Sequence, residues 1–126
     1  MYTNLAYSTY SQNNVSIESP EKLIKMLYEG ILRFSSQAKN AIENNDIEKR
    51  TYWINRTTAI FAELIHSLND DGGQIAHYLR GLYTYQIRLL TEANRFNDTT
   101  KLDEVIKVAM ELLQAWKDET ENNDME

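Results

Sequence analysis

Helix-breaking residues are scarce in this chain, whose 126 residues include one proline, Pro20, and only four glycines. Because proline and glycine interrupt regular structure most strongly, their scarcity leaves room for long helices and little room for a strand-rich fold. Polar clusters interrupt the pattern at 44–46, 69–73 and 96–100. They divide the chain after residue 19 into four segments, each long enough for a helix.

Capping signals set the expected ends of these helices. Ser19-Pro20-Glu21 combines a residue that can cap, a proline suited to the first helical position and an acid that complements the helix dipole. Asn45 and Glu48 have the spacing of a capping box, with asparagine as the cap. The sequence predicts helices over about 20–44, from this box to about 68, over 74–95 and over 101–118.

The apolar residues of each segment recur at helical spacing. In the last segment, intervals of 3, 4, 3 and 4 separate Leu102, Val105, Ala109, Leu112 and Trp116, which is the seam of a bundle helix. Four amphipathic helices with short loops predict an all-α fold, an antiparallel up-down-up-down four-helix bundle. We expect the bundle over 19–118, an N-terminal tail over 1–18 and an acidic, disordered C-terminal tail over 119–126.

Composition argues against several classes of function. The chain has no cysteine, so it can form neither disulfides nor a thiolate metal site. Its net charge is −6, and no basic stripe suited to nucleic acid occurs. The N-terminus lacks the pattern of a secretory signal, and no run of about 18 apolar residues predicts a membrane span. We expect a cytoplasmic protein that binds no nucleic acid and does not insert into membranes.

Two of the four helices are apolar over an unusually wide arc. At about 100° per residue, the apolar positions of the first helix cover roughly 240° and those of the third roughly 200°. One bundle core does not need that much surface, so the surplus predicts a groove for a partner helix. The alternatives are that these helices are central, or that the chain forms a homodimer. The expected partner-binding residues in these helices are Ile24, Tyr28, Ile31, Tyr83 and Ile87.

The N-terminal tail and two glycines bear on the same groove. Tyr7 and Tyr10 are amphipathic anchors in an otherwise polar segment, and they could occupy the groove when no partner is present. A disordered tail with incidental tyrosines explains the sequence equally well. Gly30 and Gly81 fall inside helices, where each costs about 1 kcal/mol relative to alanine. We expect them to permit close approach of a neighbouring helix rather than of a ligand.

Catalytic and metal-binding patterns are missing from the sequence. A di-iron bundle needs a Glu-x-x-His pair on each of two helices, and only Glu63 and His66 form one. His77 has Gln74 in the position of the glutamate. No glycine-rich phosphate loop and no nucleophile–base pair occur. We therefore expect no enzyme activity, no metal and no cofactor.

The chain resembles the flagellin export chaperones, the FliS family, from about Tyr2 to Trp116. The matching pieces, in order, are Ala6-Tyr7 with Tyr10, then Ser19-Pro20-Glu21-Lys22-Leu23-Ile24-Lys25-Met26-Leu27-Tyr28-Glu29-Gly30-Ile31, Leu82-Tyr83-Thr84-Tyr85, Glu92-Ala93-Asn94, Asn97-Asp98, Leu102-Asp103-Glu104-Val105 and Ala115-Trp116. Each piece is weak alone, and the resemblance rests on their order and spacing.

The resemblance implies a chaperone of the bacterial cytosol. It would bind the disordered C-terminal segment of flagellin as a helix, prevent premature polymerisation, and release flagellin at the flagellar export gate. The resemblance also implies that the N-terminal segment, and hence Tyr7 and Tyr10, caps the binding surface when flagellin is absent. It leaves open whether a co-chaperone shares that surface and whether the chain dimerises.

Overall fold

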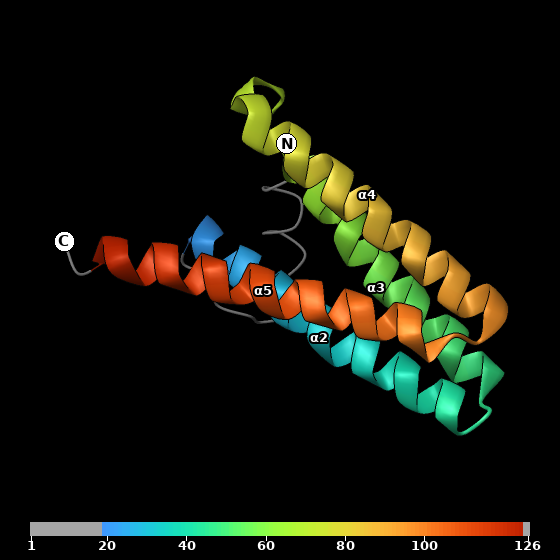
Figure 1. The fold of residues 1–126 in the computed structure, drawn as a ribbon. Coiled ribbons are helices and arrows are strands. Elements are labelled where there is room, and N and C mark those ends of the chain that lie inside the picture. Colours follow the sequence, from blue (N-terminus) through green and yellow to red (C-terminus); the bar gives the residue numbers. More distant parts are fainter. Residues whose placement is uncertain (1–18, 125–126) are drawn as a thin grey trace.

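Four long helices account for most of the described chain, which covers residues 19–124 of the computed structural model. They are α2 (Pro20–Glu43), α3 (Ile47–Ser67), α4 (Gly73–Phe96) and α5 (Thr99–Asp124), and a short 3-10 turn, η1 (Asp70–Gly72), joins α3 to α4. Successive helices run in opposite directions (Figure 1). The predicted antiparallel four-helix bundle is confirmed.

Side chains cap the helix starts, with one difference from the prediction. Ser19 Oγ accepts a hydrogen bond from the Lys22 amide, as expected for α2. At α3 the cap is Asp46 and not Asn45, because Asp46 Oδ1 accepts from the Lys49 amide at 3.1 Å. Asn45 has φ 57°, in the left-handed region that asparagine tolerates, and belongs to the turn.

The last helix is longer than predicted. It continues to Asp124, so the disordered tail expected from residue 119 is wrong for 119–124. Inside this stretch, Thr120 Oγ1 donates to the Trp116 carbonyl at 2.8 Å. Acidic composition indicates an exposed segment, but it does not by itself end a helix, and neither proline nor glycine follows Trp116.

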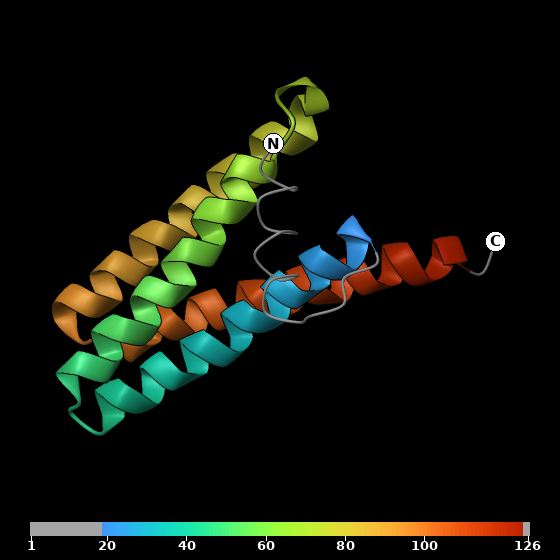
Figure 2. The ribbon, with the colours of Figure 1, turned by 180° about the vertical axis from the view of Figure 1, so that it is seen from behind.

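The helices form a four-sided bundle in which neighbours in the square pack and diagonal partners do not. Helix α2 packs against α3 and α5, and α4 packs against the same two helices. Figures 1 and 2 show that the α2–α5 pair and the α3–α4 pair lie together at one end and diverge toward the other. We call these the closed end, near Glu43 and Phe96, and the open end, near Pro20 and Gly73.

The core explains one of the two wide apolar arcs. Helix α2 buries Leu23, Leu27 and Ile31 completely or nearly so, because it is covered on two sides by α3 and α5. Its contacts with α3 and α5 are more extensive than those of α4 with the same two helices, so its apolar width is used in packing. Gly30 fits this packing, since a Cβ there would lie 3.0 Å from Ile60 Cδ1 of α3. The expected close helix–helix approach is confirmed at Gly30.

Candidate partner-binding groove

Three of the predicted partner-binding residues lie in the core. Ile31 is fully buried, and Tyr28 and Tyr83 are only 5% and 2% exposed. Their position corrects the expectation that they line an open groove. Ile24 and Ile87 are half-buried and pack against the core. Tyr7 and Tyr10 lie outside the described residues.

The two buried tyrosines form a hydrogen bond across the diagonal of the bundle. The Tyr28 and Tyr83 hydroxyl oxygens are 2.8 Å apart, and they join α2 to α4, whose backbones are separated by the core. Burial raises the pKa of both phenols above the usual value. Each hydroxyl satisfies the other, so two polar groups are accommodated in an apolar core.

Helix α4 keeps the apolar surplus that α2 lacks. Ile75, Tyr78 and Tyr85 are 73%, 67% and 52% exposed, and Leu82 between them is half-buried. Their intervals of 3, 4 and 3 place them on one helical face. We call these four residues the α4 stripe. The same spacing can be read in the sequence. The stripe residues adjoin the core-facing residues on the helical wheel, however, so the two sets together form the single wide arc and cannot be told apart there.

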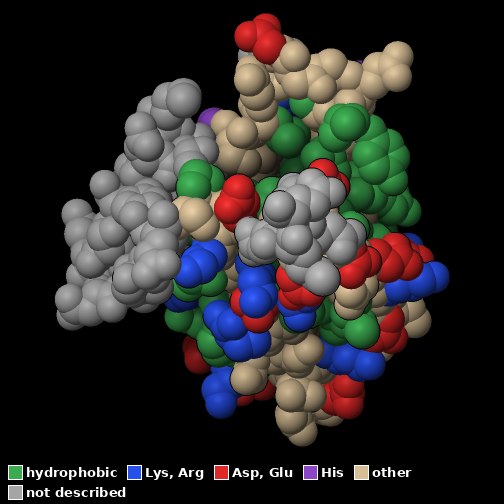
Figure 3. Space-filling model, turned by 90° about the vertical axis from the view of Figure 1, so that its left-hand side faces the viewer, with side chains coloured by type: hydrophobic (Ala, Val, Ile, Leu, Met, Phe, Trp, Pro, Cys, Tyr) green, Lys and Arg blue, Asp and Glu red, His purple; other side chains and the backbone are tan. Residues whose placement is uncertain are grey.

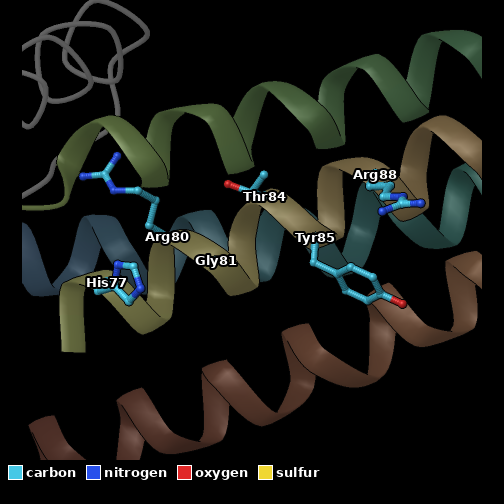
Figure 4. A pocket seen from close by; sticks show the side chains of 6 residues that line it. All are labelled: His77, Arg80, Gly81, Thr84, Tyr85 and Arg88. Atoms are coloured by element: carbon cyan, nitrogen blue, oxygen red, sulfur yellow. The ribbon is translucent and has the colours of Figure 1, made fainter. Parts of the chain in front are cut away.

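Two adjoining hollows meet the α4 stripe at Tyr85. One, of about 410 Å³, is lined by α4 alone, through His77, Arg80, Gly81, Thr84, Tyr85 and Arg88. The other, of about 330 Å³, lies between α4 and α5 and is lined by Tyr85, Gln86, Leu89, Glu104, Lys107, Val108 and Glu111. Tyr85 belongs to both, and Figure 4 shows its ring extending from α4 toward α5.

The hollow between α4 and α5 lies toward the closed end, where these helices pack, and the hollow on α4 extends from the middle of that helix toward the open end. Figure 3 looks at this end and shows hydrophobic side chains gathered below the projecting turn between α3 and α4. Toward this end α4 diverges from the α2–α5 pair (Figure 1), and Ile75 and Tyr78, the first residues of the α4 stripe, are largely exposed. The α4 stripe and the two hollows together form what we call the α4 groove.

Gly81 lies in the middle of this groove. Apart from its two chain neighbours and the backbone of its own helix, no described residue has a heavy atom within 4 Å of the position that a Cβ would occupy. The expectation that a neighbouring helix needs this glycine is therefore wrong. Because glycine weakens a helix interior, its place on an exposed face is not explained by the packing of the described helices.

The charges around the groove are mostly basic on the α4 side. Arg80 and Arg88 flank Gly81, and Arg88 Nε lies 3.5 Å from Glu92 Oε1 one turn along the helix. Figure 4 shows that Arg80 and Tyr85 leave α4 on opposite sides. Within residues 19–124, no group of three or more His, Cys, Asp and Glu side chains is arranged to hold a metal ion.

Several residues of the recognised sequence pattern serve the closed end instead of the groove. Arg50 Nε donates to Asn94 Oδ1 at 2.7 Å, and the same guanidinium donates to Asn97 Oδ1. Asn97 has φ 52° and ends α4, and Asp98 accepts from the Thr100 amide where α5 begins. These motif residues hold the α4–α5 turn against α3.

Comparison with known protein families gives a consistent result. Residues 2–123 match the family model described as "Flagellar protein FliS". The "Flagellar secretion chaperone FliS" of Campylobacter jejuni is 58% identical over 98% of this chain and 97% of its own length. The protein of the same name from Bacillus subtilis is 36% identical over 88% of this chain and 83% of its own length.

A solved structure has the same fold. The protein described as "Crystal structure of flagellar chaperone from bacteria" superposes with a TM-score of 0.77, covering 94% of this chain and 97% of its own. Its sequence identity is 20%, so this likeness concerns the helical architecture alone.

Proposed function

Because the chain belongs to the FliS family of flagellar secretion chaperones, which are not enzymes, we propose that its export substrate is the C-terminal segment of flagellin, bound as a helix in the α4 groove. Binding would take place in the bacterial cytosol and keep flagellin from polymerising before secretion. In the part of the chain that the structure describes, no helix is both long and apolar enough to cross a bilayer.

One observation carries the proposal: α4 presents an exposed apolar stripe at helix-packing intervals beside two adjoining hollows. An amphipathic helix recognises such a groove through apolar side chains at the same intervals. Ile75, Tyr78 and Tyr85 would cover the partner's apolar face, and Gly81 would let its backbone come close. Tyrosine suits this role because it contributes large contact area and a polar tip.

Coupled folding would keep the complex releasable. A segment that is disordered when free must lose conformational entropy to become a helix, and this costs about 2–5 kcal/mol of the gross interaction energy. The groove can therefore cover the apolar face completely without holding it irreversibly. Such a balance suits a chaperone that must deliver its substrate to the export gate.

The N-terminal tail has a regulatory part in the proposal. Tyr7 and Tyr10 would cap the binding surface until flagellin displaces them, as the family resemblance implies. Removing residues 1–14 would then raise the apparent affinity for flagellin, because the partner would no longer compete with the tail. An unchanged or lower affinity in the truncated protein argues against the cap.

A titration with a C-terminal flagellin peptide tests the proposal. Circular dichroism of the mixture should show more helix than the sum of the separate spectra, and an additive spectrum would reject it. Tyr85→Ala should weaken binding by about tenfold, the loss expected for an anchor worth more than about 1 kcal/mol. Phe96→Ala is the matched control, since Phe96 is a similarly exposed aromatic on α4 outside the groove.

The α4 groove could also serve as a homodimer interface. Sedimentation distinguishes this alternative from flagellin binding, because it measures the mass of the chain with and without the peptide. If the chain is a dimer and the flagellin peptide does not change its mass, the groove serves self-association. A monomer that gains the mass of one peptide supports the proposed function.

A further inference from the structure

A second surface lies on the opposite side of the bundle, where the outer faces of α2 and α3 meet. Five side chains form a cluster there, which we call the arginine–aromatic patch: Arg33, Phe34, Tyr52, Trp53 and Arg56. The Phe34 and Trp53 ring centroids are 5.3 Å apart, and Tyr52 meets Trp53 edge-on at 4.9 Å. Arg33, Tyr52 and Arg56 are exposed, and the other two are half-buried.

The two arginines share one aromatic ring. The guanidinium carbon of Arg33 lies 5.6 Å from the Phe34 centroid, and that of Arg56 lies 5.0 Å from it. Arg56 is also 5.8 Å from the Tyr52 centroid and donates to the Tyr52 hydroxyl at 3.1 Å. Contact with the rings orients both guanidinium groups, and the Tyr52 hydroxyl occupies only one donor of Arg56, so each arginine keeps N–H donors for a carboxylate.

Neither guanidinium is neutralised by the rest of the described chain. Within residues 19–124, no carboxylate oxygen lies within 4.0 Å of Arg33 or Arg56. The nearest acid along α2 is Glu29, one turn before Arg33, and the residues one turn from Arg56 on α3 are uncharged. Two cations that no described carboxylate pairs therefore lie around one aromatic ring, on a chain whose net charge is −6.

We propose that the arginine–aromatic patch binds an acidic helical segment of a second partner protein, distinct from the segment in the α4 groove. Carboxylates one turn apart lie on the same face of a helix and match two guanidinium groups that flank a single ring. Tyrosine, tryptophan and arginine are also the residues that dominate binding energy at protein interfaces. Charge complementarity thus selects an acidic partner over a neutral or basic one.

The position of the patch permits both partners to bind at once. In the four-sided bundle, the α2–α3 side is opposite the α4–α5 side, which carries the α4 groove. An occupant of one side does not cover the other. The chaperone would therefore hold its export substrate and an acidic partner together in a ternary complex.

A designed peptide provides the probe. It is a fluorescein-labelled alanine- and leucine-based helix with glutamate pairs four residues apart, and its matched control carries glutamine at the same positions. Fluorescence anisotropy should show binding of the glutamate peptide to the full chain, weakening as salt is added. Absence of binding, or equal binding of the glutamine peptide, would overturn the proposal.

Variants locate the interaction. The double substitution Arg33→Gln with Arg56→Gln should reduce affinity by at least about tenfold, and the corresponding double lysine variant should lose less, because it keeps charge without the planar fork. Arg95→Gln is the control, since the Arg95 guanidinium also lies over an exposed ring, 5.1 Å from the Phe96 centroid. An equal loss in this control would mean unspecific charge attraction and reject the patch.

Two further measurements complete the test. Thermal unfolding should show that the variants remain folded, so that lost binding reflects the patch. The flagellin peptide should leave the glutamate peptide bound, whereas displacement would place both peptides in one groove and overturn the proposal. If the wild-type chain self-associates and the double glutamine variant does not, the occupant is a second copy and not another protein.

Discussion

Replacing the buried tyrosine pair tests how the two diagonal helices are joined. Tyr28 and Tyr83 lie almost completely inside the core, with their hydroxyl oxygens 2.8 Å apart. Tyr83→Phe removes one hydroxyl and leaves the other buried without this partner, and Tyr28→Phe does the reverse. The double substitution removes both hydroxyls and keeps both rings.

The expected energies follow from the cost of an unsatisfied buried group. A buried hydroxyl that loses its partner costs about 1–3 kcal/mol, whereas replacing both partners with apolar groups of the same shape is nearly neutral. Each single variant should therefore lose about 1–2 kcal/mol of unfolding free energy, and the double variant should lose no more than either single one. The resulting coupling energy is at least about 1 kcal/mol, and residues in contact typically couple by about 0.5–3 kcal/mol.

Urea unfolding at pH 7, followed by circular dichroism, measures these free energies. Tyr78→Phe is the matched control, since this tyrosine is 67% exposed on α4 and its change should stay within about 0.5 kcal/mol. Additive losses in the double variant would show that the hydroxyls do not stabilise each other. The structural explanation for how two polar rings occupy the core would then be wrong.

Three further predictions concern a glycine, alkaline pH and acid pH. Gly81→Ala should raise the unfolding free energy by about 1 kcal/mol yet weaken flagellin-peptide binding in a titration; unchanged affinity would mean that no partner approaches Gly81. Because burial raises the pKa of Tyr28 and Tyr83, their contribution is complete below the unfolded value of 10.0 and falls as pH rises above it. The loss is up to about 1.4 kcal/mol per pH unit for each phenol, and the double phenylalanine variant should lack it in urea titrations at several pH values. Hydrogen bonds from Thr100 lower the pKa of Asp98 below 3.8, so its contribution is present above that pH and lost as pH falls through the lower folded value. Asp98→Asn should accordingly be less stable at pH 7, with a difference that shrinks under acid; a constant difference would contradict the assignment.

The fold was largely predictable because its signals are local. Helix-breaking residues, capping residues and apolar residues three or four positions apart can each be recognised from a short stretch of sequence. Together they predict all four helices and most of the helix ends. The predicted end of α5 is too early because acidic composition indicates exposure and not disorder, and no proline or glycine after Trp116 disfavours helix. The α3 cap was missed by one residue because Asn45 and Asp46 can each accept from the helix amides.

The groove was only partly predictable because apolar width does not reveal what covers a helix. The wide arcs correctly indicated surplus surface on α4, where Ile75 and Tyr85 remain exposed. The same reasoning was wrong for α2, whose width is used by two neighbouring helices. Tyr28 and Tyr83 are predicted to line a groove because tyrosine is amphipathic and common at protein interfaces. Only the fold shows that their hydroxyl groups form a hydrogen bond with each other in the core.

The closed end also determines the mechanics of the open end. The two helix pairs meet where Arg50 holds Asn94 and Asn97, and they diverge from there. Helix α4 has 24 residues and at about 1.5 Å per residue forms a lever of about 36 Å. Rotating one pair by about 5° at the closed end therefore moves the tip of α4 by about 3 Å, comparable to the rise of two helical residues. The width of the α4 groove would therefore depend on the angle between the two helix pairs, and the Tyr28–Tyr83 hydrogen bond, which joins α2 to α4, opposes a change in that angle.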